Sequence, residues 1–179
     1  MPAFVALFRA VNVGGRATVA MSDLCATAER LGLCAPRTLL QSGNLVFTSD
    51  AKPDDLERRL ETAVGADHGL ETTVLVRSAD DWGAIVAACP YPDIAGNDPS
   101  HLLVMLLREP PSAQAEADLR AAIAGRERFE LRGGTAYVHY PDGIGRSKLT
   151  ASLIERRLGT TGTARNWNTV KRIEAALAG

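Results

Sequence analysis

The chain has 179 residues, of which 46% are hydrophobic and 23% charged, and its formal net charge is -1. This length allows one domain or two small ones, with enough apolar residues for a core. A net charge this close to zero excludes a broad electrostatic attraction of the whole molecule to nucleic acid or to an acidic membrane.

Cysteine usage and the apolar runs favour a cytoplasmic protein. Cys25, Cys34 and Cys89 are odd in number and widely spaced, which predicts neither a disulfide framework nor a zinc site. Arg9 interrupts the apolar N-terminal run too early for a signal peptide. No apolar run approaches the roughly 20 residues needed to cross a bilayer. We therefore expect a cytoplasmic location and no membrane partner.

The first part of the chain has the pattern of a split βαβ unit. Ser42-Gly43 separates two short strand-like runs, which is a hairpin signal. Pro53 suits the first position of a helix. The expected elements are a strand at 4–8, a helix at 21–31, strands at 37–41 and 44–48, a helix from Pro53 and a strand at 72–77. This β-α-β-β-α-β order is ferredoxin-like.

A further helix and a loop are expected to link this unit to the next. Ser78 and Asp81 resemble a capping box in which Asp replaces the usual Glu or Gln. This helix should end at Pro90, and residues 91–99 are dense in helix and strand breakers. The segment therefore marks a boundary.

The same order of elements returns after this boundary. The expected elements are strands at 101–107, 128–131, 135–140 and 162–164, helices at 112–123 and 147–158, and a final amphipathic helix at 166–177. We predict an α+β fold of tandem ferredoxin-like (βαββαβ) subdomains with a linking helix and an extra C-terminal helix. The expected domain limits are 1–78, 79–99 and 100–179, and the alternative is a single larger α+β domain.

Charge is distributed unevenly along the chain. The segment from Arg146 to Arg172 contains seven cations and one anion, Glu155, and therefore carries +6, which leaves -7 for the rest. Such an asymmetry is typical of an anion-facing surface, and a solvated basic helix face is the alternative interpretation.

Several polar segments at the ends of expected strands and helices are candidate ligand sites. Glycines after a buried strand, as in the loop from Asn12 to Gly15, can form an anion-binding nest, although turn geometry alone also explains them. Two cations and a hydroxyl at an expected helix start, as in 146–148, suit phosphate or carboxylate. We predict a polar cleft between the two halves if Arg9, Asn12, Gln41, Asn44, Arg165 and Asn168 converge. The full set of candidate ligand-binding residues is Arg9, Asn12, Gly14, Gly15, Gln41, Ser42, Asn44, Arg146, Ser147, Lys148, Arg165, Asn166 and Asn168.

Three blocks together resemble the DUF1697 family of bacterial proteins. They are Arg9-Ala10-Val11-Asn12-Val13-Gly14-Gly15, Gln41-Ser42-Gly43-Asn44, and 142–149 with 165–169. The family usually has Gly where this chain has Ala10. The resemblance implies an α+β fold of duplicated ferredoxin-like units and no established activity.

The sequence predicts a binding protein for an anionic or nucleotide-like small molecule. The histidines at 68, 101 and 139 are isolated, so we predict no metal site, and no motif indicates a cofactor. Arginines and amides cannot act as bases at neutral pH, which gives no catalytic residue for the alternative of an enzyme. A nucleic-acid-binding module acting through the basic C-terminal segment is a second alternative that we do not favour, because aromatic residues are sparse on the predicted strands.

Overall fold

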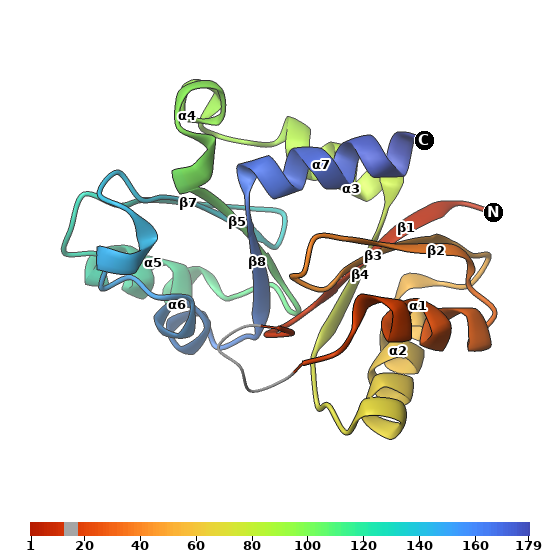
Figure 1. Cartoon of the computed structure of the whole chain (residues 1–179). Coiled ribbons are helices and arrows are strands. Elements are labelled where there is room, and N and C mark those ends of the chain that lie inside the picture. Colours follow the sequence, from red (N-terminus) through yellow and green to blue (C-terminus); the bar gives the residue numbers. More distant parts are fainter. Residues whose placement is uncertain (13–17) are drawn as a thin grey trace. The chain divides into compact units, whose positions relative to one another are not determined.

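The computed structural model describes residues 1–12 and 18–179 and divides them into two compact units. The first unit contains Met1–Ala84 together with Arg172–Gly179, and the second contains Ile85–Lys171. The chain therefore leaves the first unit within one helix and returns to it within another (Figure 1).

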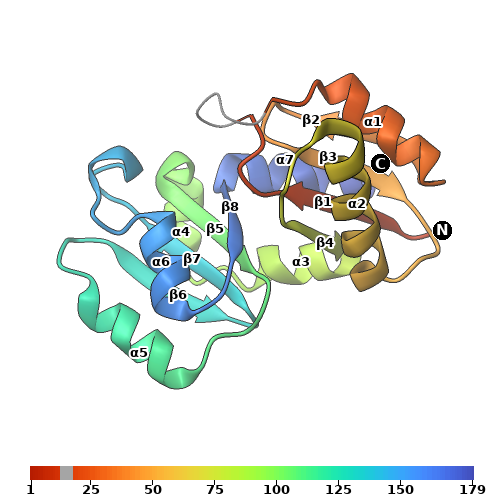
Figure 2. The ribbon, with the colours of Figure 1, turned by 90° about the horizontal axis from the view of Figure 1, so that it is seen from below.

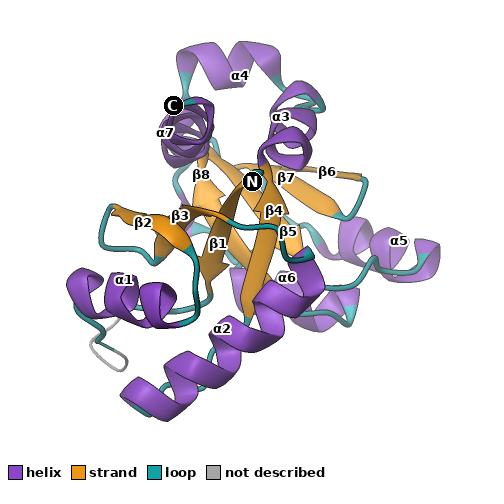
Figure 3. Cartoon of the chain, turned by 90° about the vertical axis from the view of Figure 1, so that its right-hand side faces the viewer, coloured by secondary structure: helices purple, strands orange, loops and turns teal. Residues whose placement is uncertain are grey.

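The first unit contains a four-stranded antiparallel sheet with the order β2-β3-β1-β4. Its elements are β1 (Ala3–Phe8), α1 (Met21–Arg30), β2 (Cys34–Leu39), β3 (Asn44–Thr48), α2 (Pro53–His68), β4 (Val74–Ser78) and the start of α3 (Ala79–Ala87). Leu24 on α1 and Leu56 and Leu60 on α2 form one core cluster with Phe4 and Phe47 of the sheet. Both helices accordingly cover one face of this sheet (Figure 3).

The second unit repeats this topology, with the sheet order β6-β7-β5-β8. Its elements are α4 (Pro92–Asn97), β5 (Leu102–Leu107), α5 (Ala113–Ala122), β6 (Arg128–Arg132), β7 (Thr135–His139), α6 (Ala151–Leu158), β8 (Gly162–Asn166) and the start of α7 (Trp167–Ala178), with short 3-10 helices at Pro99–His101 and Ile144–Arg146. Leu119 on α5 and Ile154 on α6 pack with Met105 and Val138 of the sheet. Helices α5 and α6 therefore lie against this sheet (Figure 2).

The strand orders confirm the predicted α+β fold of two ferredoxin-like units. In each unit the first strand lies between the third and the fourth and pairs antiparallel with both. The predicted capping box of α3 is also present, because the Ser78 hydroxyl accepts from the Asp81 amide at 3.1 Å and the Asp81 carboxylate accepts from the Ser78 amide at 3.3 Å.

Several predicted element limits are wrong. Helix α3 ends at Ala87 rather than at Pro90. Strand β2 begins at Cys34 rather than 37, because a register shift between Cys34 and Arg37 accommodates Ala35 at a φ of 48°. Helix α4 lies inside the segment predicted as a loop, with Pro92 at its start. Helix α6 begins at Ala151 rather than 147, because the Thr150 hydroxyl is the group that caps it.

Among the residues that the structure describes, no helix is long and apolar enough to cross a membrane.

Candidate functional site

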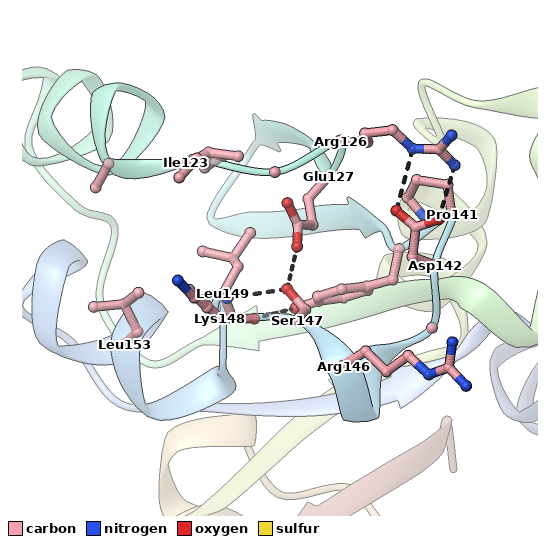
Figure 4. Close-up of a pocket in the computed structure, with 15 residues that line it drawn as sticks. Ile123, Arg126, Glu127, Pro141, Asp142, Arg146, Ser147, Lys148, Leu149 and Leu153 are labelled. Atoms are coloured by element: carbon pink, nitrogen blue, oxygen red, sulfur yellow. Dashed lines mark hydrogen bonds and ion pairs between the residues drawn. The ribbon is translucent and has the colours of Figure 1, made fainter.

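The second unit contains a pocket of about 350 Å³, here called the loop pocket, which is formed by three connecting segments (Figure 4). Residues 122–127 run from the last residue of α5, residues 140–143 follow β7, and residues 146–149 precede α6. Leu153 on α6 completes the lining. The predicted candidates Arg146, Ser147 and Lys148 all line this pocket.

One wall of the loop pocket is apolar. Ile123, Leu149 and Leu153 contribute aliphatic side chains to it, and all three belong to the core cluster of the second unit or pack against it. The buried Tyr140 donates its hydroxyl to the Leu149 carbonyl at 2.9 Å and so ties the two sides of the connecting segment together. Burial raises the pKa of Tyr140 to about 12, so this phenol stays neutral and remains a donor.

A carboxylate, Glu127, lies at the centre of the loop pocket. The Ser147 hydroxyl donates to Glu127 Oε1, and the same Ser147 oxygen accepts from the Leu149 amide at 3.0 Å (Figure 4). The hydrogen bond from Ser147 and one from the backbone of Glu127 itself lower the pKa of this carboxyl group, against the opposing effect of burial. Glu127 is therefore ionised at neutral pH.

A second carboxylate at the pocket is neutralised by an arginine. Arg126 donates from Nε to Asp142 Oδ2 at 3.1 Å and from Nη2 to Oδ1 at 3.0 Å. This fork geometry engages both carboxylate oxygens. Arg126 and Asp142 thus add no net charge to the pocket.

Arg146 and Lys148 are the uncommitted cations of the loop pocket. Both side chains are exposed, and neither forms a hydrogen bond or an ion pair with another residue in the described ranges 1–12 and 18–179. With Glu127 ionised and Arg126 paired to Asp142, the lining has a formal charge of +1. The pocket therefore presents two free cationic groups beside one acceptor-only group.

The expected anion site at a helix start is wrong for residues 146–148. Ser147 and Lys148 precede α6 by several residues, and Ser147 uses its hydroxyl for Glu127 and Leu149 instead of a helix cap. An anion in the pocket would thus interact with side-chain charges rather than with the amides at the start of α6.

In the first unit, the candidate side chains form hydrogen bonds that stabilise the turns at the ends of the strands. Asn12 donates to the carbonyls of Val19 at 3.2 Å and Gln41 at 3.0 Å, and its side-chain oxygen accepts from the Val19 amide. The buried Asn44 donates to the Leu39 carbonyl at 2.9 Å and to the Ser42 hydroxyl at 3.0 Å. The structure therefore brings Asn12, Gln41, Ser42 and Asn44 to one end of the first sheet.

The backbone at this end of the first sheet is closely packed. Gly43 has a φ of 68°, and a Cβ added there would lie 3.1 Å from the Phe8 Cβ. The Arg9 amide donates to Thr73 and its carbonyl accepts from Thr72. Gly14 and Gly15 lie outside the described residues.

The remaining candidates lie at the end of β8 and the start of α7. Arg165 is only 8% exposed, and its Nη1 donates to Thr163 at 2.9 Å and to the Ala164 carbonyl at 2.8 Å. Burial lowers the pKa of Arg165 to about 10, so it remains a cation at neutral pH. Asn166 caps α7 by accepting from the Thr169 amide at 3.0 Å, and Asn168 is exposed. A shared cleft would draw on both units and remains a prediction.

A histidine cluster is present that sequence reasoning missed. Asp98 lies 2.8 Å from His101 Nδ1 and 3.3 Å from His139 Nε2, and His139 Nδ1 is buried without a hydrogen-bond partner. Burial acts to raise the pKa of Asp98, but hydrogen bonds from the two histidines outweigh it and lower that pKa. The described part of the chain contains no group of three or more His, Cys, Asp or Glu side chains that could hold a metal ion.

Comparisons with known proteins agree with this architecture. A conserved bacterial protein, SP0830 from Streptococcus pneumoniae, has a solved structure that matches 98% of this chain and 98% of its own, with a TM-score of 0.78 and 20% sequence identity. At this identity the match shows the fold alone. A comparison with curated proteins finds no match.

The family comparison agrees with the motifs of the first half. The model of a protein family of unknown function, DUF1697, matches residues 1–137, which include two of the three resembling blocks. The loop pocket segment 140–149 lies beyond the matched range. Because the match covers more than half of the sequence, the chain belongs to the DUF1697 family.

Proposed function

We propose that this protein binds a small anionic molecule in the loop pocket. The observation that carries the proposal is the pair of uncommitted cations, Arg146 and Lys148, on the lining of a pocket of about 350 Å³. Ligand pockets commonly measure roughly 300 to 1,000 Å³ and combine an apolar lining with a few polar groups.

The local charges favour an anion over a cation. Arg126 is already paired with Asp142, and Glu127 is partly satisfied by Ser147. Hydrogen bonds to charged groups contribute about 1.5 to 3 kcal/mol each. Contacts from Arg146 and Lys148 to one phosphate or carboxylate group, about 3 to 6 kcal/mol together, would therefore support binding in the range of roughly tens of micromolar to a few millimolar.

Binding of single-stranded nucleic acid on the sheets is less well supported. Ferredoxin-like RNA-binding sheets stack bases on exposed aromatic side chains of their strands. In this chain the strand aromatics Phe4, Phe8, Phe47, Phe129 and Tyr137 are all at most 4% exposed. This burial favours a small ligand in a pocket over a polynucleotide on a sheet.

Titration calorimetry with inorganic pyrophosphate tests the proposal. The intact protein should bind pyrophosphate, and Lys148→Ala or Arg146→Ala should each weaken binding about tenfold, because each removes one charged contact. Arg157→Ala is the matched control, since Arg157 is an exposed arginine of the same unit outside the pocket lining. Its affinity should stay within about twofold of the unaltered protein.

Two results would contradict the proposal. One is the absence of measurable pyrophosphate binding at millimolar concentration. The other is an equal loss of affinity in Arg157→Ala and Lys148→Ala, which would indicate general charge attraction rather than a site.

A further inference from the structure

We infer that the ligand of the loop pocket is a ribonucleoside monophosphate, with its phosphate at Arg146 and Lys148, its ribose hydroxyls at Glu127 and its base on the wall of Ile123, Leu149 and Leu153. This inference rests on the proposed function, since it names the molecule that carries the anionic group. It follows because one pocket combines two cations, a carboxylate and an aliphatic wall.

The carboxylate of Glu127 is the feature that a simple anion leaves unexplained. A carboxylate repels a phosphate, yet Glu127 lies on the same lining as Arg146 and Lys148. An ionised carboxylate is an acceptor with about four lone-pair sites, and the Ser147 hydroxyl and the Glu127 amide use about two of them. The remaining sites suit neighbouring hydroxyl donors, and a carboxylate that binds ribose hydroxyls is a common device in nucleotide sites.

The absence of a side chain at Gly125 and the hydrogen bond from Ser147 fix the position of the Glu127 carboxylate. A Cβ added to Gly125 would lie 2.2 Å from Glu127 Oε2, so the carboxylate occupies the space that a side chain at 125 would need. Ser147 holds the other oxygen and is itself fixed by the Leu149 amide. The Glu127 carboxylate therefore points toward Ser147 on the pocket lining (Figure 4).

The aliphatic wall supplies the third part of the site. Ile123, Leu149 and Leu153 lie on the side of the loop pocket away from Arg126 and Asp142 (Figure 4). A planar base can bury apolar surface against such side chains, at about 25 cal/mol per Å². A sugar phosphate without a base would leave the half-buried Ile123 and Leu153 of this wall uncovered.

Calorimetry on the full chain with four probes tests the inference. The probes are adenosine 5′-monophosphate, its 2′-deoxy and 2′,3′-dideoxy analogues, and inorganic pyrophosphate. Adenosine monophosphate should bind about tenfold more tightly than the dideoxy analogue, because the analogue loses hydrogen bonds to a charged acceptor. In Glu127→Gln this ratio should fall to within about twofold, while pyrophosphate affinity stays the same or rises, because a repulsive charge is removed.

Two further variants separate a ligand role from a structural one. Gly125→Ala should displace the carboxylate and reduce the ribose preference while pyrophosphate binding persists. Glu109→Gln is the matched control, because Glu109 is an exposed glutamate of the same unit outside the pocket lining, and it should leave the ratio unchanged.

The outcomes distinguish the inference from the proposed function. Equal binding of the ribose and dideoxy nucleotides, with pyrophosphate binding that still depends on Lys148, would overturn the inference and leave the anion site standing. Failure of all four probes to bind would overturn both.

Discussion

Ala10 has a φ of 56°, in the left-handed region that favours glycine. Glycine adopts this conformation without the steric cost of a Cβ. A residue with a Cβ costs roughly 1 to 2 kcal/mol more in this region.

Ala10→Gly should therefore stabilise the protein, by about 1 kcal/mol after the greater chain entropy of unfolded glycine is subtracted. Ala121→Gly, in the exposed face of α5, is the control with the opposite sign and should destabilise by about 1 kcal/mol. Urea denaturation measures both. A destabilised Ala10→Gly variant would show that the backbone at this turn is not strained.

The tyrosines give a prediction about pH. Burial raises the pKa of both Tyr137 and Tyr140 to about 12, and burial also raises that of Tyr91. The unfolded chain titrates near 10, so between about pH 10 and 12 it releases protons that the native tyrosines retain. The contribution of these groups to stability is thus fully present below pH 10 and is lost as the pH rises toward 12.

Ultraviolet absorbance of the phenolate form measures this difference. The native protein should show tyrosine ionisation displaced above pH 10, and the protein in denaturant should titrate near 10. Native tyrosines that ionise at the same pH as the denatured ones would contradict their burial.

At the scale of elements, Asn166 and Asn168 at the start of α7 have different roles. Asn166 accepts from the Thr169 amide at 3.0 Å, whereas the Asn168 side chain is exposed and forms no hydrogen bond with another described residue. Asn166→Ala should cost about 1 kcal/mol of unfolding free energy through loss of the cap, and Asn168→Ala should change it by less than about 0.5 kcal/mol. Thermal unfolding of the two variants checks this, and equal effects would rule out the capping role.

Most strands and helices have a local signal in the sequence, but the start of α6 does not. The alternation of strands and helices in both halves could be predicted, because each hairpin and each amphipathic face has a local signal. The start of α6 could not, because Ser147 resembles a cap in sequence but bonds to Glu127, 20 residues earlier. The bend at Ala35 was missed for a related reason, since nothing in the sequence marks an alanine at positive φ.

The candidate site could be predicted only in part. Arg146, Ser147 and Lys148 are contiguous and were found from their charge and spacing, and they line one pocket. Glu127, the paired Arg126 and Asp142, and the aliphatic wall come from separate segments, so only tertiary packing brings them to this site. The predicted convergence of Arg9, Asn12, Gln41 and Arg165 depends on both units and stays a prediction.

At the scale of the whole molecule, the C-terminal residues belong to the unit formed by the N-terminus. Ile173 is fully buried, and Arg37 of β2 donates to the Ala176 carbonyl. Ile173→Ala should destabilise the first unit by about 2 to 5 kcal/mol through loss of buried surface and creation of a cavity.

Denaturation followed by tryptophan fluorescence checks this prediction. Trp82 lies in the first unit and Trp167 in the second, so a Trp167→Phe background leaves Trp82 as the reporter. The denaturation midpoint should fall for Ile173→Ala and stay unchanged for Arg172→Ala, which alters an exposed side chain in the same helix. An unchanged midpoint in Ile173→Ala would contradict the assignment of the C-terminal segment to the first unit.

The return of the chain to its first unit also affects the order in which the two units can finish folding during synthesis. Residues emerge from the ribosome from the N-terminus onward, at roughly 5 to 20 per second, and folding usually follows that direction. Here the first unit also needs residues made after the second unit, since 172–179 belong with Met1–Ala84. The nascent protein can finish its inserted half before its outer half, so maturation runs opposite to translation.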